Sequence, residues 1–528
     1  MNDELRYLMA RTVAGRHSRR AFLGRAAAFG VTATMANTML AGAARAATPK
    51  QGGTLKMGLG GGQSTDSLDP ALAASQVPFM YLMTTSDRLT DVAPDGSILN
   101  RLAEEISSSP DAKTWTFKIR KGVQFHNGKT LTPDDVLKTM QRHSDKDSKS
   151  GALGIMKGIE SMKVDGDNFV VTLVTPNADL PYLMSDYHLA IQPGGGIDKP
   201  NAGIFTGPYK WTSNEPGVRY VMDKFENYWD SERGHYDQIQ MIVINDATAR
   251  NAALQSGQVQ MVNGVEPRVA GLLKRAPNVT VAASSGRGFY CFNMFCDTAP
   301  FDNNDLRLAL KYAIDREELV NKILAGYGSV GNDMPVNASY PLFDSTIPQR
   351  TYDPDKAKFH FKKSGYDGEV LVRTADGAFA GAVDATQLFQ QSAAKAGIKL
   401  TIKREPNDGY WSEVWNKKPF SASYWGGRPT QDQMYSTAYI SSADWNDTNY
   451  KNPKFDKLIL DARGELDKAK RKEMYREAGM MIRDTGGLIN PMFNQFINAY
   501  DKNKVVGWTD NPNQDMMNGL AGVLCWQA

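Results

Sequence analysis

Cysteine is scarce in this sequence, which has only Cys291, Cys296 and Cys525 among 528 residues. No CxxC pair or Cys/His cluster occurs, so neither a disulfide-stapled scaffold nor a structural zinc site is expected. Cys291 and Cys296 stand five apart in an expected strand and would point to opposite faces of it. If a disulfide forms, Cys525 is the better partner for either of them.

Motifs of enzyme chemistry are also missing. The chain has no Gly-x-Ser-x-Gly, HExxH or P-loop, and its six histidines are scattered without the spacing of metal ligands. The glycine-rich loop 60–64 has Gln63 where a dinucleotide fingerprint needs its last glycine, so we interpret the loop as a strand-to-helix turn. We therefore expect no catalytic residue, no bound metal and no cofactor.

Charge of one sign is concentrated only at the N-terminus. The first 46 residues hold seven arginines and two acids, whereas acids slightly outnumber bases in the rest. A nearly neutral chain without a basic patch gives no reason to expect nucleic-acid binding. Later in the chain no stretch approaches about 20 apolar residues, so the processed protein is expected to be soluble.

The N-terminus reads as an export signal. Arg19-Arg20 precedes Phe22-Leu23 and a weakly apolar run, and small residues before Ala46 fit a cleavage site. The paired arginines resemble a twin-arginine (Tat) signal, so residues 1–46 are expected to be removed near Ala46. The alternative is a retained membrane anchor, which the glycine, threonine and asparagine residues of the run disfavour.

The sequence after residue 46 predicts an α/β protein in two parts. Before about residue 287 it is rich in strands, expected at 54–59, 114–120, 123–128, 169–174, 219–222 and 239–244. Thr132-Pro133 with two acids predicts a helix start, so Asp134 and Asp135 are interpreted as capping residues and not as catalytic acids. From Phe289, strands and helices alternate, which is typical of a largely parallel lobe.

Five blocks resemble family 5 of the extracellular solute-binding proteins, and they occur in the family's order. They are Gly52–Leu55 with Leu68–Pro70; Thr114–Gly128 closing on Leu131–Val136; Gly207–Tyr209; Asn227–Trp229; and Pro300–Phe301 with Leu306–Arg316. This family contains dipeptide-, oligopeptide- and nickel-binding proteins of ABC importers. The resemblance covers nearly all of the chain beyond residue 46.

The resemblance implies a two-lobed periplasmic-binding-protein fold, type II and cluster C-like. Lobe I would comprise residues 47–287 and 486–528, lobe II residues 288–485, and two crossing segments would form the hinge. It further implies a monomeric, non-enzymatic protein of the periplasm that captures a solute and delivers it to ABC permease subunits in the inner membrane.

One motif departs from the family. Peptide binders carry Trp-x-x-Asp in lobe II, where the acid pairs with the ligand's ammonium group, whereas this chain has Trp425-Gly426-Gly427-Arg428. The change favours a small polar anion, either peptide-like or opine-like. Arg428 cannot lose its proton, so burial requires an anionic partner. That partner is either the ligand, or Asp432 or another acid of the protein, and the third possibility is exposure to solvent.

The other candidate ligand-binding residues cluster around that motif or at the expected cleft edges. Tyr424, Trp425 and Trp411 offer aromatic faces, for which core packing is the alternative. The full set of expected ligand-binding residues is Arg428, Trp425, Tyr424, Gly426, Asp432, Asn293, Tyr290, Gln63, Ser64 and Trp411.

Three other functions remain open at this point. The first is a Tat-exported enzyme, for which no cofactor motif is found. The second is a nickel or haem carrier of the same fold. The third is an added role in presenting the ligand to a chemoreceptor.

Overall fold

The structure is a computed structural model that describes residues 49–73, 75–145, 148–406, 410–443 and 445–528. The expected signal peptide therefore lies outside the described residues. Among the described helices, none combines the length and the apolarity that a bilayer crossing requires. All three cysteines are free.

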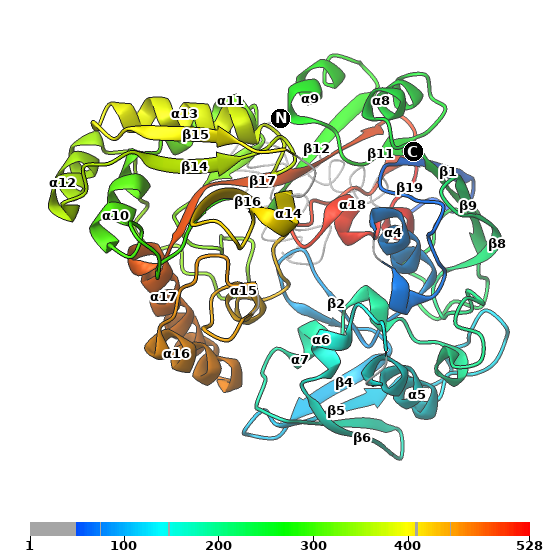
Figure 1. Ribbon diagram of the computed structural model, residues 1–528. Coiled ribbons are helices and arrows are strands. Elements are labelled where there is room, and N and C mark those ends of the chain that lie inside the picture. The colour runs from blue at the N-terminus through cyan, green and yellow to red at the C-terminus, as the bar shows by residue number, and fades with distance from the viewer. Residues whose placement is uncertain (1–48, 74, 146–147, 407–409, 444) are drawn as a thin grey trace, which may run out of the picture.

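An eleven-stranded sheet runs through the centre of the described part of the chain (Figure 1). Its order is β15-β14-β16-β12-β17-β11-β1-β10-β9-β8, and β13 pairs with β17. The strands are β1 (Thr54–Leu59), β8 (Tyr209–Glu215), β9 (Arg219–Lys224), β10 (Gln238–Val243), β11 (Met261–Val262), β12 (Val279–Met294), β13 (Gly328–Val330), β14 (Val370–Thr374), β15 (Leu400–Arg404), β16 (Phe420–Trp425) and β17 (Leu488–Asp501).

The long strands β12 and β17 connect the two ends of this sheet. They pair antiparallel from Val279↔Asp501 to Asn293↔Leu488, and β16 pairs antiparallel with β12. Only β14 pairs in parallel on this side, with β15 and β16. The expectation of a largely parallel second part is thus wrong for the central strands. The chain enters that part along β12 and leaves along β17, and these strands must run in opposite directions.

The hydrophobic cores separate into two groups. Two clusters use residues between 289 and 493. Three use residues between 55 and 283, two of them together with residues after 496. We call the part with the three clusters lobe I and the part with the two clusters lobe II. The exact boundaries at 287/288 and 485/486, and a hinge at those points, stay predictions.

A second, four-stranded sheet belongs to lobe I and lies at the bottom of Figure 1. Its described strands are β4 (Ala103–Ser108), β5 (Thr114–Ile119), β6 (Ile159–Asp165) and β7 (Asn168–Leu173). Two separate two-stranded sheets pair β2 (Thr90–Val92) with β3 (Ile98–Asn100) and β18 (Val505–Val506) with β19 (Trp526–Gln527). The strand expected at 123–128 is wrong. Only an isolated bridge between Gln124 and Thr130 forms there, because the intervening residues turn back on themselves.

Capping sets the helix starts as expected. Thr132 and Asp135 form a complete capping box at the start of α5, and Asp315 accepts from the Glu318 backbone at the start of α11. Lobe I carries η1 (Pro70–Leu72), α4 (Gln76–Thr85), α5 (Pro133–Ser144), α6 (Leu153–Met156), α7 (Leu180–Leu183), η2 (Tyr187–Leu189), η3 (Pro193–Gly196), α8 (Ala247–Gln255), α9 (Pro267–Leu273), α18 (Asp515–Asn518) and α19 (Ala521–Leu524).

The helices of lobe II lie around the β14-β15-β16 end of the large sheet (Figure 1). They are α10 (Asn304–Ala313), α11 (Arg316–Ile323), α12 (Pro354–Ser364), α13 (Ala382–Ala394), α14 (Tyr410–Glu413), α15 (Gln431–Ala438), α16 (Pro453–Gly464) and α17 (Lys468–Thr485). One core cluster packs α10, α11 and α13 on one face of the sheet. The other packs α15, α16 and α17 on the opposite face, next to lobe I.

Candidate functional site

Two adjoining cavities lie between the lobes. The small chamber, about 190 Å³, is lined by residues of α4, of the segment 185–187 and of the C-terminal segment 513–518, and from the other side by Arg287 and residues 426–429. The large chamber, about 570 Å³, is lined by residues between 151 and 186 of lobe I and between 428 and 463 of lobe II. Asp186, Arg428 and Pro429 line both chambers, so the two meet beside Arg428.

A glycine turn after β16 places Arg428 between the chambers. Gly427 has φ +77°, and a Cβ atom added to it would lie 2.5 Å from the Cβ of Arg287. Only glycine satisfies both the left-handed conformation and this close approach. The Arg428 backbone N–H then donates to the Tyr340 hydroxyl at 3.0 Å, which fixes the turn.

The Arg428 guanidinium has no carboxylate partner among the described residues. Its Nη1 donates to the Gly427 carbonyl at 2.7 Å, and its Cζ lies 5.5 Å from the centroid of the Trp425 ring. Asp432, the alternative internal partner, is instead bound by the Nε of Arg463 at 3.1 Å. Burial lowers the pKa of Arg428, although the side chain stays charged. This partly buried cation therefore lacks the anion that its environment calls for.

A second arginine lines the small chamber. Arg287 is almost fully buried and donates to the carbonyls of Ser339 and Pro429, both at 3.0 Å, and to Oδ1 of Asn513 at 2.6 Å. These acceptors are neutral, and burial lowers the pKa of this guanidinium too. The acid among the described lining residues of this chamber is Asp186, whose Oδ1 lies 2.7 Å from Nδ1 of His188. The small chamber is therefore electropositive.

Carboxamides complete the small chamber. Asn513, Gln514 and Asn518 come from the segment around α18, whose residues 516–518 all have positive φ, between 51° and 60°. Three consecutive left-handed residues other than glycine are costly, at about 1–2 kcal/mol each. Burial of Met516 and Met517 in the lobe I core holds the turn in this conformation. Such strained turns cluster where a protein must aim particular side chains at a ligand.

Residues 97–447 match the model of the bacterial extracellular solute-binding proteins, family 5, middle part. That match covers more than half of the sequence. The chain belongs to this family.

This solute-binding protein is 26% identical over 436 residues to the glutathione-binding protein GsiB of Pectobacterium atrosepticum, and the match covers 79% of this chain and 84% of that one. The periplasmic binding protein DppA of Helicobacter pylori, solved with the peptide STSA, aligns with a TM-score of 0.73 at 22% identity, covering 90% and 98% of the two chains. AgaA of A. tumefaciens R10, solved with agropinic acid, aligns with a TM-score of 0.72 at 23% identity, covering 90% and 99%.

These comparisons confirm the fold and the broad function. The structural neighbours are two-lobed periplasmic binding proteins with mixed α/β lobes, and this solute-binding protein has the same fold. Its family serves transport by binding, so the chain is the substrate-binding component of an ABC importer and not an enzyme. The chambers at Arg428 lie between the two lobes of this fold.

Three of the expected site residues line the chambers, and two more lie beneath them. Arg428 lines both chambers, Gly426 the small one and Asp432 the large one. Trp425 is buried under the Arg428 guanidinium, and its indole N–H donates to Oδ2 of Asp447 at 3.2 Å. Asn293 lies behind it, since its Nδ2 donates to the same oxygen at 2.7 Å.

The structure does not bring the other expected residues to these chambers. Tyr290 and Tyr424 lie opposite each other on the far face of the sheet, where Tyr290 stacks on Phe379. Gln63 and Ser64 are exposed and pack beside Gly217 in lobe I. Trp411 belongs to α14, but its side chain lies outside the described residues.

The sequence reasoning missed Arg287, Asn513 and Trp445. One local signal existed for Arg287, which is a charged residue between two glycines at the expected lobe crossing. Asn513 and Trp445 carry no local signal, because only the folding of distant segments brings them to the cleft.

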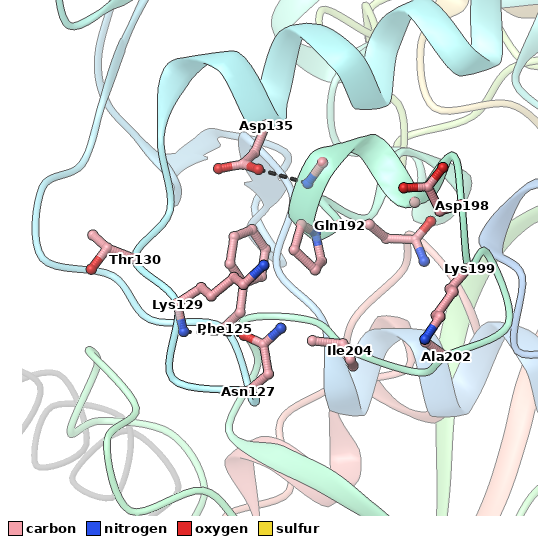
Figure 2. A pocket seen from close by; sticks show the side chains of 13 residues that line it. Phe125, Asn127, Lys129, Thr130, Asp135, Gln192, Asp198, Lys199, Ala202 and Ile204 are labelled. Carbon is pink, nitrogen blue, oxygen red and sulfur yellow. Dashed lines mark hydrogen bonds between the residues drawn. The ribbon is translucent and has the colours of Figure 1, made fainter.

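A further cavity, of about 500 Å³, lies within lobe I (Figure 2). Its lining residues come from the segments 125–135 and 192–204, and none of them was an expected site residue. Asp135, which Figure 2 shows at this cavity, already accepts from the backbone N–H of Gly194 at 2.7 Å and caps α5 through Thr132. We therefore assign this cavity no part in solute binding.

Metal ligands are not gathered anywhere in the described part of the chain. No group of three or more histidine, cysteine, aspartate or glutamate side chains is close enough to hold an ion.

Proposed function

We propose that this chain is a periplasmic binding subunit that captures a small polar anion, either peptide-like or opine-like, between its lobes and delivers it to ABC permease subunits. The single observation that supports the anion is the partly buried Arg428 guanidinium, which has no described carboxylate partner. A carboxylate or phosphate of the solute would supply bidentate, charge-assisted hydrogen bonds there. The Tat-type signal over residues 1–46, cleavage near Ala46 and the monomeric state are part of this proposal.

The relatives support the solute class without defining it. GsiB is named for glutathione, DppA was solved with a peptide, and AgaA was solved with agropinic acid. All three solutes carry at least one carboxylate. In this chain Arg428 stands at the end of the Trp-x-x-Asp motif of peptide binders, so the carboxylate end of the solute is the part that it would hold.

The test begins with protein expressed from the full chain and purified from the periplasm. Mass spectrometry of a denatured extract identifies any solute that copurifies. Thermal unfolding is then measured with matched pairs of acids and their neutral amides, drawn from peptides, opines, sugar acids and organic acids. A ligand at 100 times its dissociation constant adds about 2.7 kcal/mol of stability.

We expect the acids to stabilise the protein against thermal unfolding and the matching amides to stabilise it far less. In an Arg428→Asp variant the fold should persist and the acids should no longer bind. Equal stabilisation by acids and amides, or unchanged binding of the acids by the variant, would remove the proposal.

A further inference from the structure

The large chamber is three times the size of the small one and opens from the same guanidinium. Its volume is about 570 Å³ against about 190 Å³. Arg428, Asp186 and Pro429 are shared by the two, so a group bound to Arg428 stands at the junction. Whatever is attached to the anionic group of the solute has room to extend into the large chamber.

Four aliphatic residues line the lobe I wall of this chamber, together with Thr175, Asn177 and Asp186. Leu173, Leu180 and Leu183 are buried in the protein core at less than 10% exposure, and Ile155 lies beside them. On the lobe II side Trp445 lines the same chamber with half of its surface exposed. A large aromatic residue left half exposed inside a cleft is a typical contact for an apolar ligand group.

Trp445 is also held in place by other rings. Its centroid lies 6.1 Å from that of Trp425, at an interplanar angle of 56°, and 6.1 Å from that of Trp415, at 75°. Because Trp425 in turn lies under the Arg428 guanidinium, the apolar contact surface and the cation belong to one packed unit. The exposed face of Trp445 is therefore fixed relative to the anion-binding group.

Apart from Arg428, the charged side chains that line the large chamber already have partners: Asp186 contacts His188, and Asp432 contacts Arg463. Asp432 accepts from Nε of Arg463 at 3.1 Å through both oxygens, and the same arginine donates to Oγ of Ser436 at 2.7 Å. A second charged group on the solute would find no unpaired partner on this wall. An uncharged substituent avoids that desolvation cost.

We propose that the solute is an amphipathic anion, with its acid at Arg428 and an apolar aliphatic or aromatic substituent in the large chamber between Leu180 and Trp445. This inference rests on the proposed function, because it assumes that Arg428 binds the acid. It adds that the acid alone is a weak ligand and that the apolar substituent supplies most of the affinity.

A ladder of N-acylglycines tests the inference, because its members share one carboxylate and differ only in the acyl chain. Acetyl-, butanoyl-, hexanoyl-, octanoyl- and benzoyl-glycine are titrated into the periplasmic protein by calorimetry. Each buried methylene should tighten binding about three- to fourfold until the chamber is filled. Trp445→Ser should flatten this slope, and the control Phe359→Ser, which removes an exposed aromatic residue on α12, should leave it unchanged.

Each outcome is decisive. The inference is supported if affinity rises with the length of the acyl chain in the wild type and no longer does so in Trp445→Ser. Equal affinities along the ladder, an unchanged slope in Trp445→Ser, or binding of hydrophilic acids without any acylglycine would overturn it, while the proposed function stands. If neither the acylglycines nor the acids of the broader panel bind, the proposed function itself has failed.

Discussion

Replacing Arg428 by methionine should separate solute binding from folding. The substitution keeps the length of the side chain and removes its charge and all of its donors. The guanidinium is partly buried and lies over the Trp425 ring, and among the described residues its hydrogen-bond acceptor is the Gly427 carbonyl. Losing a cation without a carboxylate partner should leave the free energy of unfolding unchanged or raise it by up to about 1 kcal/mol.

The loaded protein should respond in the opposite direction. Removing one partner of a buried, hydrogen-bonded charge pair costs about 2–5 kcal/mol of binding free energy. Arg428 retains some exposure, so the lower part of that range applies, about 2–3 kcal/mol, which weakens binding about 30- to 150-fold. Arg428→Lys keeps the charge but loses the bidentate geometry, and its loss should be intermediate.

Calorimetric titration with the copurified solute, or with the tightest acid of the panel, measures the affinity, and urea unfolding without ligand measures the stability. The matched control is Arg275→Gln, because Arg275 is exposed and lines neither chamber. An Arg428→Met protein that binds the acid as tightly as the wild type would refute the reasoning. So would a variant that unfolds several kcal/mol more easily, because Arg428 would then be a structural residue.

Three further predictions concern the groups around the cleft. Gly427→Ala should cost about 2 kcal/mol or more of stability in urea unfolding, whereas Gly426→Ala, whose Cβ meets open space, should cost under about 0.5 kcal/mol. Burial raises the pKa of Asp447 to about 7, so its stabilising contribution is complete below about pH 4 and is lost as the pH rises through 7. Asp447→Asn should therefore be more stable than the wild type at pH 8, by up to about 4 kcal/mol, with the difference vanishing toward pH 4 in urea titrations. Arg471 of lobe II pairs with the buried Asp179 of lobe I at 2.8 Å, and Arg471→Met leaves that carboxylate without its partner. The variant should bind the solute more weakly and have a larger radius of gyration in X-ray scattering. A double variant that adds Asp179→Leu should recover both properties.

Much of the fold followed from local patterns. The capping residues Thr132 and Asp315 gave correct helix starts because their hydrogen bonds involve only neighbouring residues. The strand expected around Phe125 was wrong, since alternation of side chains there reflects a tight turn whose apolar residue still reaches the core. Strand direction could not be read from the sequence either, because it depends on how β12 and β17 cross between the lobes.

The residues of the candidate site were predicted where the family motif covers them and missed elsewhere. Arg428 was proposed because a motif residue differs in charge from the family pattern, and its role in binding stays a prediction. Tyr290 and Asn293 were proposed together, although residues three apart on a strand point to opposite faces, and the structure places only Asn293 on the face of Trp425. That error was avoidable from the sequence alone. The position of Asn513 could not be predicted from the sequence. Asn513 accepts a hydrogen bond from Arg287, and the two residues are more than 200 positions apart in the chain.

The two arginines of the small chamber, Arg287 and Arg428, differ in how many of their hydrogen-bond donors have a described acceptor. Arg287 donates three hydrogen bonds to neutral acceptors, two in lobe II and one in the C-terminal segment of lobe I. These bonds hold β12, the turn at Gly426-Gly427 and the C-terminal segment together. Among the described residues Arg428 gives one side-chain hydrogen bond, to the carbonyl of the neighbouring Gly427, and we propose that its remaining donors bind the solute. A second cation that is already satisfied raises the local potential without competing for the solute. In the proposed function Arg428 selects the anion, and we expect Arg287 to make the same chamber unfavourable for the ammonium end of a peptide.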